Sequence, residues 1–342
     1  MVSRIGVVGL GLIGGSLALR LVDAGCEVVA WNHRDHSYGE ARSRGIVCVD
    51  SLEALTASDP QIIVLCNPLR AMPQVLGELS RFLDPSRTTL TDVGSVKAMV
   101  RRQVAAAGLA DCYVGAHPMA GNERSGFDAA DPTLFDGALW AVTVDGRTSW
   151  ERLEAVASMI ADLVGDDLIV VDDRTHDRAA AMISHMPHAV STALINELCD
   201  DPDRAVAAAL SAGSWRDMTR VALTDPARTR AMIEEDGENV ELLLRSMAAR
   251  LDAVADALHD GDEESLAEFF RHGQPFRDYR LAMRGRTAPQ PKADPGDDGP
   301  RDLTLDGGEN WRDDLLRSAV RGERIRSLGP GRTAAVVSRP FA

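Results

Sequence analysis

His117 has the surroundings of an acid–base group. It begins the segment "HPMAGNERSG" and closes a strand-like run, "CYVGA". A proline biases the residue before it towards an extended conformation, so the His117 side chain leaves the strand in a defined direction. Imidazole changes its charge near neutral pH and is the side chain that most often moves protons in catalysis. From position alone His117 is either such a group or a hydrogen-bonded structural residue, and the second case is the commoner one.

Ser95 lies in "TDVGSVK", residues 91–97, between a strand-like run and a helical pattern. In doubly wound α/β folds ligands bind at the carboxyl edge of the sheet, which is where this serine is expected. Serine is also a preferred N-cap of a helix. The two interpretations are compatible, and both place Ser95 on the same edge as His117.

The second half of the chain carries two further polar motifs. In "SHMPH", Ser184 and His188 are four residues apart and share a helix face if the helix continues through Pro187. No acidic residue stands at ligand spacing, as it does in H-E-x-x-H, so we expect no metal here. In "WRDMTR", Asp217 and Arg220 are spaced i, i+3, which is also the spacing of an ordinary surface ion pair.

The segment "GLGLIGGS", residues 9–16, fits the pattern G-x-G-x-x-G through Gly9, Gly11 and Gly14. A strand-like run precedes it and a helical pattern follows, which is the context of a dinucleotide-binding turn. The first helical turn, with Leu12 and Ile13, is expected to offer free N–H groups and the positive end of the helix dipole to a pyrophosphate. The alternative is a glycine-rich turn without a ligand.

The end of the second strand indicates which dinucleotide is bound. An acidic residue there accepts hydrogen bonds from the ribose 2′-hydroxyl of NAD. This chain has "AWNHR", with Asn32 at that place and Arg34 two residues on. Removing the carboxylate removes a repulsion against a 2′-phosphate, and Arg34 can pair with one, so NADP is slightly favoured over NAD. Asn32 can still bond a ribose hydroxyl, so NAD stays open.

The pattern of elements predicts an α/β fold with three parts. Residues 1–173 alternate short β-branched runs with helical stretches, which predicts a doubly wound parallel sheet, a Rossmann domain. Its strand-like runs are "RIGVVGL", "EVVAWN", "IIVLCN", "TLTDVG" and "ALWAVTV". Residues 174–285 read as all-helical, a substrate and dimerisation domain. Residues 286–342 begin as a Pro/Gly/Asp-rich linker and end in a tail that we assign to no domain.

Composition excludes several classes of protein. The chain has 342 residues and a formal net charge of −15, which argues against nucleic-acid and membrane partners because both require a basic face. The five cysteines form no C-x-x-C pair, and no leader or apolar span of bilayer length is present. We therefore expect a cytoplasmic protein that acts on a small molecule.

Together, five motifs resemble the prephenate and arogenate dehydrogenases of tyrosine biosynthesis. The motifs "GLGLIGGS", "DVGSVK", "HPMAG", "SHMPH" and "WRDMTR" stand in that family's order and spacing, and the resemblance runs from about residue 3 to about residue 282. It implies a Rossmann domain followed by an all-helical dimerisation domain in a homodimer. It also implies NAD(P)-dependent oxidative decarboxylation of prephenate to 4-hydroxyphenylpyruvate.

The resemblance also implies a role for each candidate residue. His117 matches the catalytic histidine that accepts the proton of the substrate 4-hydroxyl, and Ser95 matches the serine that bonds both. Arg220 matches the arginine that binds a substrate carboxylate, with Asp217 as its supporting partner. The remaining pocket residues implied in this way are Ser184 and His188 from the helical domain and Glu123 at the pocket entrance.

The chain departs from the family in three respects. Asn32 replaces the common aspartate, no chorismate mutase precedes the Rossmann domain, and the tail shows no ACT-type regulatory pattern. We therefore expect a monofunctional enzyme that keeps its activity when residues 287–342 are removed.

Three alternatives remain. The first is arogenate dehydrogenase, the same reaction on a substrate with an amino group in place of the side-chain ketone. The second is a β-hydroxyacid dehydrogenase, which needs a catalytic lysine in its helical half, yet no lysine occurs between Lys97 and Lys292. The third is a non-catalytic, dinucleotide-binding redox sensor, which has no need of His117, Ser95 and Arg220 together.

Overall fold

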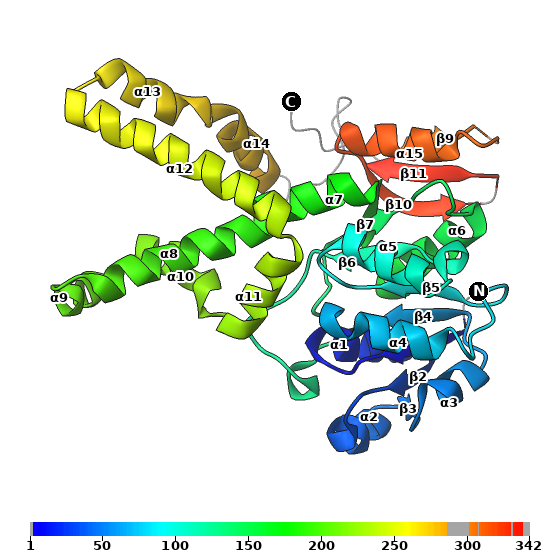
Figure 1. Cartoon of the computed structure of the whole chain (residues 1–342). Helices are drawn as coiled ribbons and strands as arrows, with labels where there is room; N and C mark the ends of the chain where they lie inside the picture. The colour runs from blue at the N-terminus through cyan, green and yellow to red at the C-terminus, as the bar shows by residue number, and fades with distance from the viewer. Residues whose placement is uncertain (1–2, 286–300, 307, 330, 338–342) are drawn as a thin grey trace.

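The computed structural model describes residues 3–285, 301–306, 308–329 and 331–337. Its first half is a parallel sheet covered by helices on both faces, with the helical half standing to one side (Figure 1). The sheet order is β3-β2-β1-β4-β5. The strands are β1 (Arg4–Val8), β2 (Glu27–Trp31), β3 (Val47–Cys48), β4 (Ile62–Leu65) and β5 (Thr89–Asp92). The accompanying helices are α1 (Leu12–Asp23), α2 (Tyr38–Ser43), α3 (Leu52–Ala57), α4 (Met72–Leu79) and α5 (Lys97–Ala106).

Burial explains why these segments are strands. All four residues of Ile62–Leu65 are fully buried, because helices cover a parallel sheet on both faces and leave no polar side to alternate with. The expected doubly wound parallel sheet is thereby confirmed for the first five strands.

A second sheet continues the first and is mixed. Its order is β6-β7-β8-β10-β11-β9, and a parallel bridge from Leu90 to Tyr113 places β6 beside β5. The strands are β6 (Gly115–Pro118), β7 (Leu139–Thr143), β8 (Asp167–Val171), β9 (Arg301–Thr304), β10 (Arg324–Gly329) and β11 (Thr333–Val337). Of the pairs, only β7–β8 is parallel. The run "CYVGAHP" therefore enters the sheet in the opposite direction to "ALWAVTV", which a βαβ reading did not anticipate.

The C-terminal tail, which the sequence pattern assigned to no domain, belongs to this second sheet. The helix α15 (Trp311–Val320) follows β9, and Ile325 of β10 pairs with Leu168 of β8. Trp311 is 3% exposed and packs edge-on against Trp150 of α6 (Trp150–Ser158), with ring centroids 5.4 Å apart. The Pro/Gly/Asp-rich linker itself, residues 286–300, lies outside the described residues. Removing the tail would therefore uncover part of the core, and the expectation that activity survives truncation is withdrawn.

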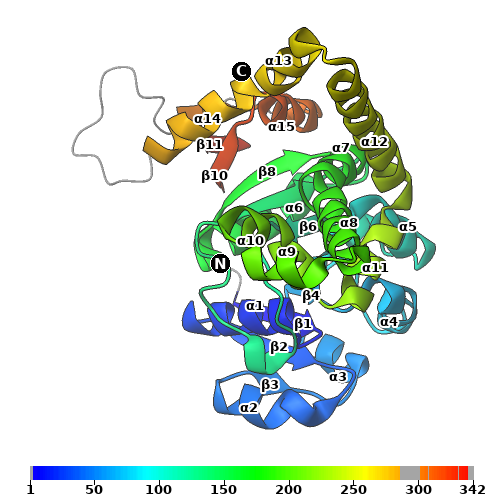
Figure 2. The ribbon, with the colours of Figure 1, turned by 90° about the vertical axis from the view of Figure 1, so that its left-hand side faces the viewer.

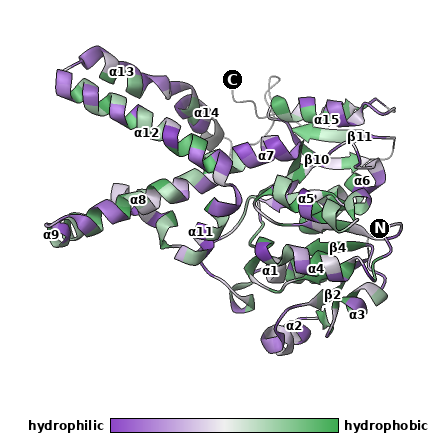
Figure 3. Ribbon diagram, in the orientation of Figure 1, coloured by the Kyte–Doolittle hydropathy of each residue, from purple (hydrophilic) through white to green (hydrophobic). Residues whose placement is uncertain are grey.

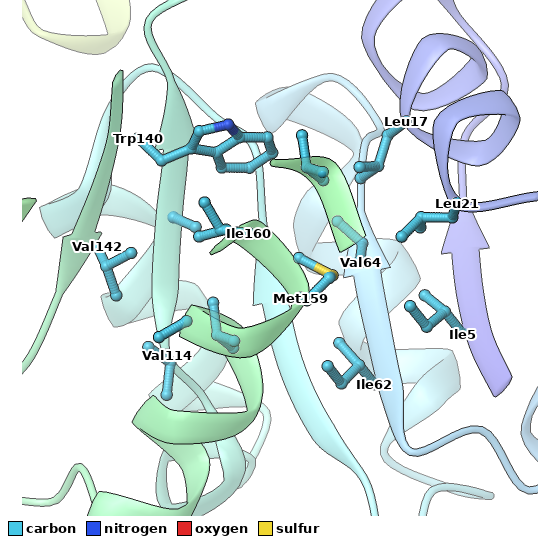
Figure 4. Packing of buried hydrophobic residues seen from close by; sticks show 14 of the residues in the cluster. Ile5, Leu17, Leu21, Ile62, Val64, Val114, Trp140, Val142, Met159 and Ile160 are labelled. Atoms are coloured by element: carbon cyan, nitrogen blue, oxygen red, sulfur yellow. The ribbon is translucent and has the colours of Figure 1, made fainter. Parts of the chain in front are cut away.

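The main core lies between the sheet and the helices that close it. Figure 4 shows Met159 and Ile160 inserted between Trp140 of β7 and the side chains of β1, β4 and α1. Trp140 is fully buried, and its indole N–H donates to Asp166 at 3.0 Å, so the large ring is buried without an unsatisfied donor.

The helical half begins with one long, composite helix. It runs through α7 (Asp173–Ala180), the π-helical turn η6 (Ala181–His185) and α8 (Met186–Asp200). Pro187 lies in the first turn of α8 but in the interior of the composite helix, where a proline cannot donate the backbone hydrogen bond of a regular helix. The wider π turn just before it accommodates the missing bond. The helix therefore survives Pro187, as the shared face of Ser184 and His188 requires.

Shorter helices and a hairpin complete this half. They are α9 (Arg204–Leu210), α10 (Gly213–Thr219), the 3₁₀ turn η7 (Arg220–Leu223), α11 (Pro226–Glu235), α12 (Gly237–Asp260), α13 (Glu263–His272) and α14 (Gln274–Gly285). Figure 1 shows α12 and α13 extending away from the sheets. Large apolar side chains are exposed on α12, α13 and α14: Leu242, Leu251, Leu258, Phe270, Phe276 and Leu281.

Apolar residues follow the strands, while the helices carry mixed surfaces (Figure 3). Among the described residues no helix combines the length and the apolar character needed to cross a bilayer.

The place of the tail in the core predicts the effect of one substitution. Trp311→Ala removes a buried ring and should lower the free energy of unfolding by about 3–5 kcal/mol. Urea unfolding at a fixed protein concentration measures this. Val320→Ala on the same helix is the control: its side chain is 88% exposed, so the change should stay within about 0.5 kcal/mol. Equal stability of the two variants would show that the tail is not part of the core.

Candidate active site

The turn between β1 and α1 is built for close approach of a ligand to backbone. Gly9 has φ +104°, a conformation that side chains disfavour, and a Cβ on Gly14 would lie 2.0 Å from the Gly9 carbonyl oxygen. Nothing lies within 4 Å of a Cβ on Gly11. The helix α1 starts at Leu12 without a side-chain cap, so the first-turn N–H groups, including that of Ile13, face no capping side chain. These residues fit the pyrophosphate of a dinucleotide.

Asn32 holds the end of β2 against this turn. Its Oδ1 accepts a hydrogen bond from the Leu10 N–H at 3.0 Å, and its Nδ2 donates to the Arg34 carbonyl oxygen at 2.8 Å. The amide thus uses one acceptor and one donor on backbone, and the Arg34 side chain is exposed. Position 32 contributes no negative charge at the place where a ribose is bound in this fold.

His117, on β6, ends a hydrogen-bonded chain of three side chains. Its Nδ1 lies 3.0 Å from His176 Nε2, and His176 Nδ1 lies 2.8 Å from Asp177 Oδ1. An ionised carboxylate only accepts, so His176 donates from Nδ1 and accepts at Nε2. Neutral His117 must then donate from Nδ1, which leaves its Nε2 lone pair as the proton acceptor.

Asp177 anchors the chain by capping a helix in the other domain. Its two carboxylate oxygens accept from the backbone N–H groups of Lys97, at 2.7 Å, and Ala98, at 3.0 Å. Burial raises the pKa of Asp177, but the bonds from His176 and these two N–H groups outweigh burial and leave the pKa below its ordinary value. The carboxylate therefore remains ionised and keeps the tautomer of His176 defined.

The surroundings of His117 favour its neutral form. Burial, and then electrostatic interactions with His176, Lys97 and His185, hold the pKa of His117 well below its ordinary value of 6.5. A neutral imidazole is the form that can accept a proton, so the environment suits His117 to that task at neutral pH.

A buried ion pair positions the strand that carries His117. Lys97 and Asp92 are both fully buried and paired, and Lys97 Nζ also donates to the Ala116 carbonyl oxygen at 2.7 Å. The Tyr113 hydroxyl donates to the other oxygen of Asp92 at 2.7 Å. Every charge in this group has a partner, as burial requires. Together these bonds fix β6 just before His117.

Ser95 lies between β5 and α5 on the same edge of the sheet, and the structure contradicts one of its two expected roles. Among the described residues no hydrogen bond joins Ser95 to His117, whose Nδ1 faces His176 instead. Nor is Ser95 a cap: the N-cap of α5 is Val96, which makes no side-chain cap, and Asp177 supplies the carboxylate there. The N-cap interpretation is therefore wrong, and a bond from Ser95 to substrate stays a prediction.

The helical-half candidates lie on two packed elements. His188 Nδ1 donates to the Ser184 carbonyl oxygen at 2.9 Å, which leaves His188 Nε2 as an acceptor. Arg220 opens η7, which packs against α8. Arg220 and Asp217 are both exposed, and no ion pair joins them in the part of the chain that the structure describes, so the surface-pair interpretation is wrong.

Glu123 is exposed in the segment after β6. Among the described residues no group of three or more His, Cys, Asp or Glu side chains could hold a metal ion.

Sequence reasoning missed His176 and Asp177. Their signal was available: "DLIVVDDRTHD" is a strand followed by a polar cluster, so its histidine and last aspartate fall at the strand end where His117 also lies. This polar cluster looks like the acidic first turn of an ordinary helix, so the pattern offered no reason to single out His176 and Asp177.

Comparison with known proteins decides the family. Residues 17–167 match the family model described as prephenate dehydrogenase, nucleotide-binding domain, and residues 172–272 match its dimerization domain. The chain belongs to the prephenate dehydrogenase family. It is an NAD(P)-dependent oxidoreductase with a dimerization domain.

Three similar proteins illustrate the breadth of this family. Prephenate dehydrogenase of Lactococcus lactis is 28% identical over 80% of this chain and 76% of its own length. The solved structure of prephenate dehydrogenase from A. aeolicus with hydroxyphenyl propionate and NAD+ covers 83% of this chain and 99% of its own, with TM-score 0.74 and 27% identity. Synechocystis arogenate dehydrogenase covers 80% of this chain and 99% of its own, with TM-score 0.70 and 28% identity.

The hydrogen-bonded chain predicts a shifted pH profile when its middle member changes. His117 must be neutral to accept a proton, so kcat/KM falls as pH drops through its lowered pKa, and the acid limb of the wild type lies below pH 6.5. His176→Gln removes the electrostatic interaction with His176 that helps to lower the pKa of His117, so the acid limb should move to higher pH. It also loosens the imidazole and should lower kcat by about 10–100-fold.

Steady-state rates from pH 5 to 9 measure both effects. His259→Gln, an exposed histidine on α12, is the matched control and should leave the profile unchanged. If the acid limb of the kcat/KM profile and kcat are both unchanged in His176→Gln, His176 neither shifts the pKa of His117 nor orients its imidazole.

Proposed function

We propose that this chain catalyses oxidative decarboxylation of prephenate with His117 Nε2 as the proton acceptor. The observation that carries the proposal is the chain Asp177–His176–His117, which leaves Nε2 as a free acceptor at the carboxyl edge of the sheet. The bound nicotinamide supplies the acceptor for the hydride that leaves ring C4. His117 accepts the 4-hydroxyl proton as the carbonyl forms. Carbon dioxide departs as the ring becomes aromatic, and the resulting phenolate oxygen takes a proton back.

Arg220 is proposed to bind a carboxylate of the substrate. It is exposed, and the described residues offer it no ion-pair partner, so its planar fork is available for two carboxylate oxygens. Its element packs on the helix that carries His188 and Ser184, so these side chains are candidates for the same pocket. Asp217 is exposed and is proposed as a supporting partner of Arg220. Glu123 is also exposed and is proposed as a residue at the pocket entrance.

Prephenate is preferred here over arogenate as the substrate. Two of the three relatives described above are prephenate dehydrogenases, and one of them is a solved structure over 83% of this chain. The Synechocystis arogenate dehydrogenase makes arogenate the second candidate. The two substrates share the ring that reacts at His117 and differ only in the side chain, which is why the His117 geometry suits both.

NADP is proposed as the preferred dinucleotide. Asn32 leaves no carboxylate to repel a 2′-phosphate, and its hydrogen bond to the Arg34 backbone fixes the residue that carries the nearby cation. An exposed guanidinium on a fixed backbone suits a phosphate.

A homodimer through the helical half is also proposed. The match to a dimerization domain and the exposed apolar side chains on α12, α13 and α14 support it.

A paired assay tests substrate and dinucleotide together. The purified protein is given prephenate or arogenate, each with NAD or NADP, and kcat/KM is compared. We expect the largest value with prephenate and NADP. Arg34→Ala should weaken NADP but not NAD, because only NADP carries the 2′-phosphate. Asn32→Asp should weaken NADP and favour NAD, since it restores the carboxylate. Turnover of arogenate alone would reject prephenate as the substrate.

Two substitutions separate proton acceptance from substrate binding. His117→Asn should lower kcat by about 10²–10⁴-fold with little change in the KM for prephenate, because the acceptor is lost but the pocket remains. Arg220→Gln should mainly raise that KM. Normal turnover by both variants would refute the site assignment and favour the non-catalytic sensor.

A further inference from the structure

One arginine of the helical half ties down a segment of the nucleotide-binding half. Arg228, on α11, donates from Nη1 to the Arg124 carbonyl oxygen at 2.9 Å and from Nη2 to the Asn122 carbonyl oxygen at 2.8 Å. The acceptors precede Arg228 by 104 and 106 residues. The residue between them is Glu123. The two Nη groups of one guanidinium therefore bind the backbone carbonyl oxygens on either side of Glu123, the proposed entrance residue.

Arg228 is itself held by the start of its helix. The helix α11 begins at Pro226, and Asp225 Oδ1 accepts a hydrogen bond from the Arg228 N–H at 2.9 Å. Proline and an aspartate cap define the first helical turn, so the side chain starts from a fixed backbone. A lysine at this place cannot reproduce the two-armed contact.

The gripped segment, residues 119–126, is called the strap below. It starts on the sheet two residues after His117, where the Met119 N–H donates to the Leu139 carbonyl oxygen at 2.9 Å. It ends at Gly126, whose φ of +84° turns the chain into the short helix η4 (Phe127–Ala129).

The residues that follow the strap pack against α1, the helix proposed to bind the dinucleotide. Phe127 is 3% exposed, and a Cβ on Gly15 of α1 would come within 2.8 Å of its ring. The Asp131 N–H donates to Ser16 Oγ at 2.9 Å. In Figures 1 and 2 the chain after β6 descends to a position beside α1. The strap thus leaves the sheet beside His117, reaches the helix that binds the dinucleotide, and is fastened midway to the helical half.

We propose that Arg228 is a positioning residue that fastens the strap over the entrance of the dehydrogenase site. The inference rests on the proposed function, because it assigns Glu123 and His117 to that site. Every residue of the strap from Gly121 to Gly126 is exposed. Among the described residues, the only hydrogen bond within this stretch that involves a side chain runs from the Arg124 N–H to Asn122 Oδ1, at 2.9 Å. Its position over the entrance therefore depends on the two bonds from Arg228.

Trypsin cleavage tests the fastening without any substrate. Trypsin cuts after Arg124, and it needs the strap detached to do so. Cleavage of a briefly opened segment follows the open population. Arg228→Gln should therefore speed cleavage at Arg124 by about tenfold. Arg228→Lys keeps the positive charge on a single nitrogen but loses the two-armed fork, so its cleavage rate should fall between those of Arg228→Gln and the wild type. The fragments are identified by mass spectrometry.

Arg230→Gln is the matched control. Arg230 lies two residues further along α11 and pairs with Glu234 of the same helix, so its loss leaves the strap untouched. Its cleavage rate should equal that of the wild type. Thermal unfolding of each variant is the check on folding. An unchanged Tm indicates that only the strap is detached, whereas a lost transition indicates that the variant does not fold.

Kinetics then show what the strap does for the reaction. Arg228→Gln should raise the KM for prephenate about fivefold or more, while kcat stays within about twofold and the KM for the dinucleotide is unchanged. A loose entrance weakens substrate binding but leaves His117 and α1 in place. Arg228→Lys should recover part of the loss.

The outcomes distinguish this inference from the proposed function. Unchanged cleavage in Arg228→Gln, or a fall in kcat with an unchanged KM, overturns the role of Arg228. If Arg228→Gln is folded and cleaved faster, but the wild-type protein oxidises neither prephenate nor arogenate, Arg228 still holds the strap in place. The proposed dehydrogenase function would then be rejected.

Discussion

The Asp177 carboxylate is the group on which the geometry of the site depends. A buried charge is costly unless its hydrogen-bonding capacity is met, and Asp177 meets it with three donors: His176 and the N–H groups of Lys97 and Ala98. These donors come from both halves of the chain. One buried charge therefore joins α5 to α7, sets the tautomer of His176 and leaves a lone pair on His117.

The composite helix connects the end of the sheet to the helical half, which carries the proposed substrate-binding residues. It starts at the end of β8, passes His176, and continues through the π turn to His188 without a break. A loop in its place would let the helical half drift relative to His117. The C-terminal strands add to this rigidity, since β10 pairs with β8, the strand that leads into the helix.

Charge explains the placement of the exposed arginines. The chain has a net charge of −15, so it repels anions at long range, whereas dinucleotides and prephenate are both anionic. Cations must then be supplied locally, on defined backbone. Arg34 beside the dinucleotide turn and Arg220 beside α8 are the cations proposed for this role, and the guanidinium of Arg228 binds two backbone carbonyl oxygens instead.

Local pattern determined much of this protein from the sequence alone. Glycine spacing predicted the turn after β1, because only glycine tolerates the φ of Gly9 and the contact at Gly14. Buried apolar runs predicted β1, β2, β4 and β5 of the parallel sheet but not the two-residue β3. The strand-like run before His117 placed that residue at the sheet edge. These features depend on a few residues that are neighbours in the chain, so the local sequence pattern is enough to predict them.

Only the tertiary structure decided which polar groups meet. Asp177 caps a helix 80 residues away, and His117 contacts His176 across 59 residues, pairings that no local pattern encodes. The tail was misjudged for the same reason: Trp311 is core only because Trp150 lies opposite it. Long-range partners satisfy buried charges and fill cavities, and the choice among such partners is made by folding, not by sequence spacing.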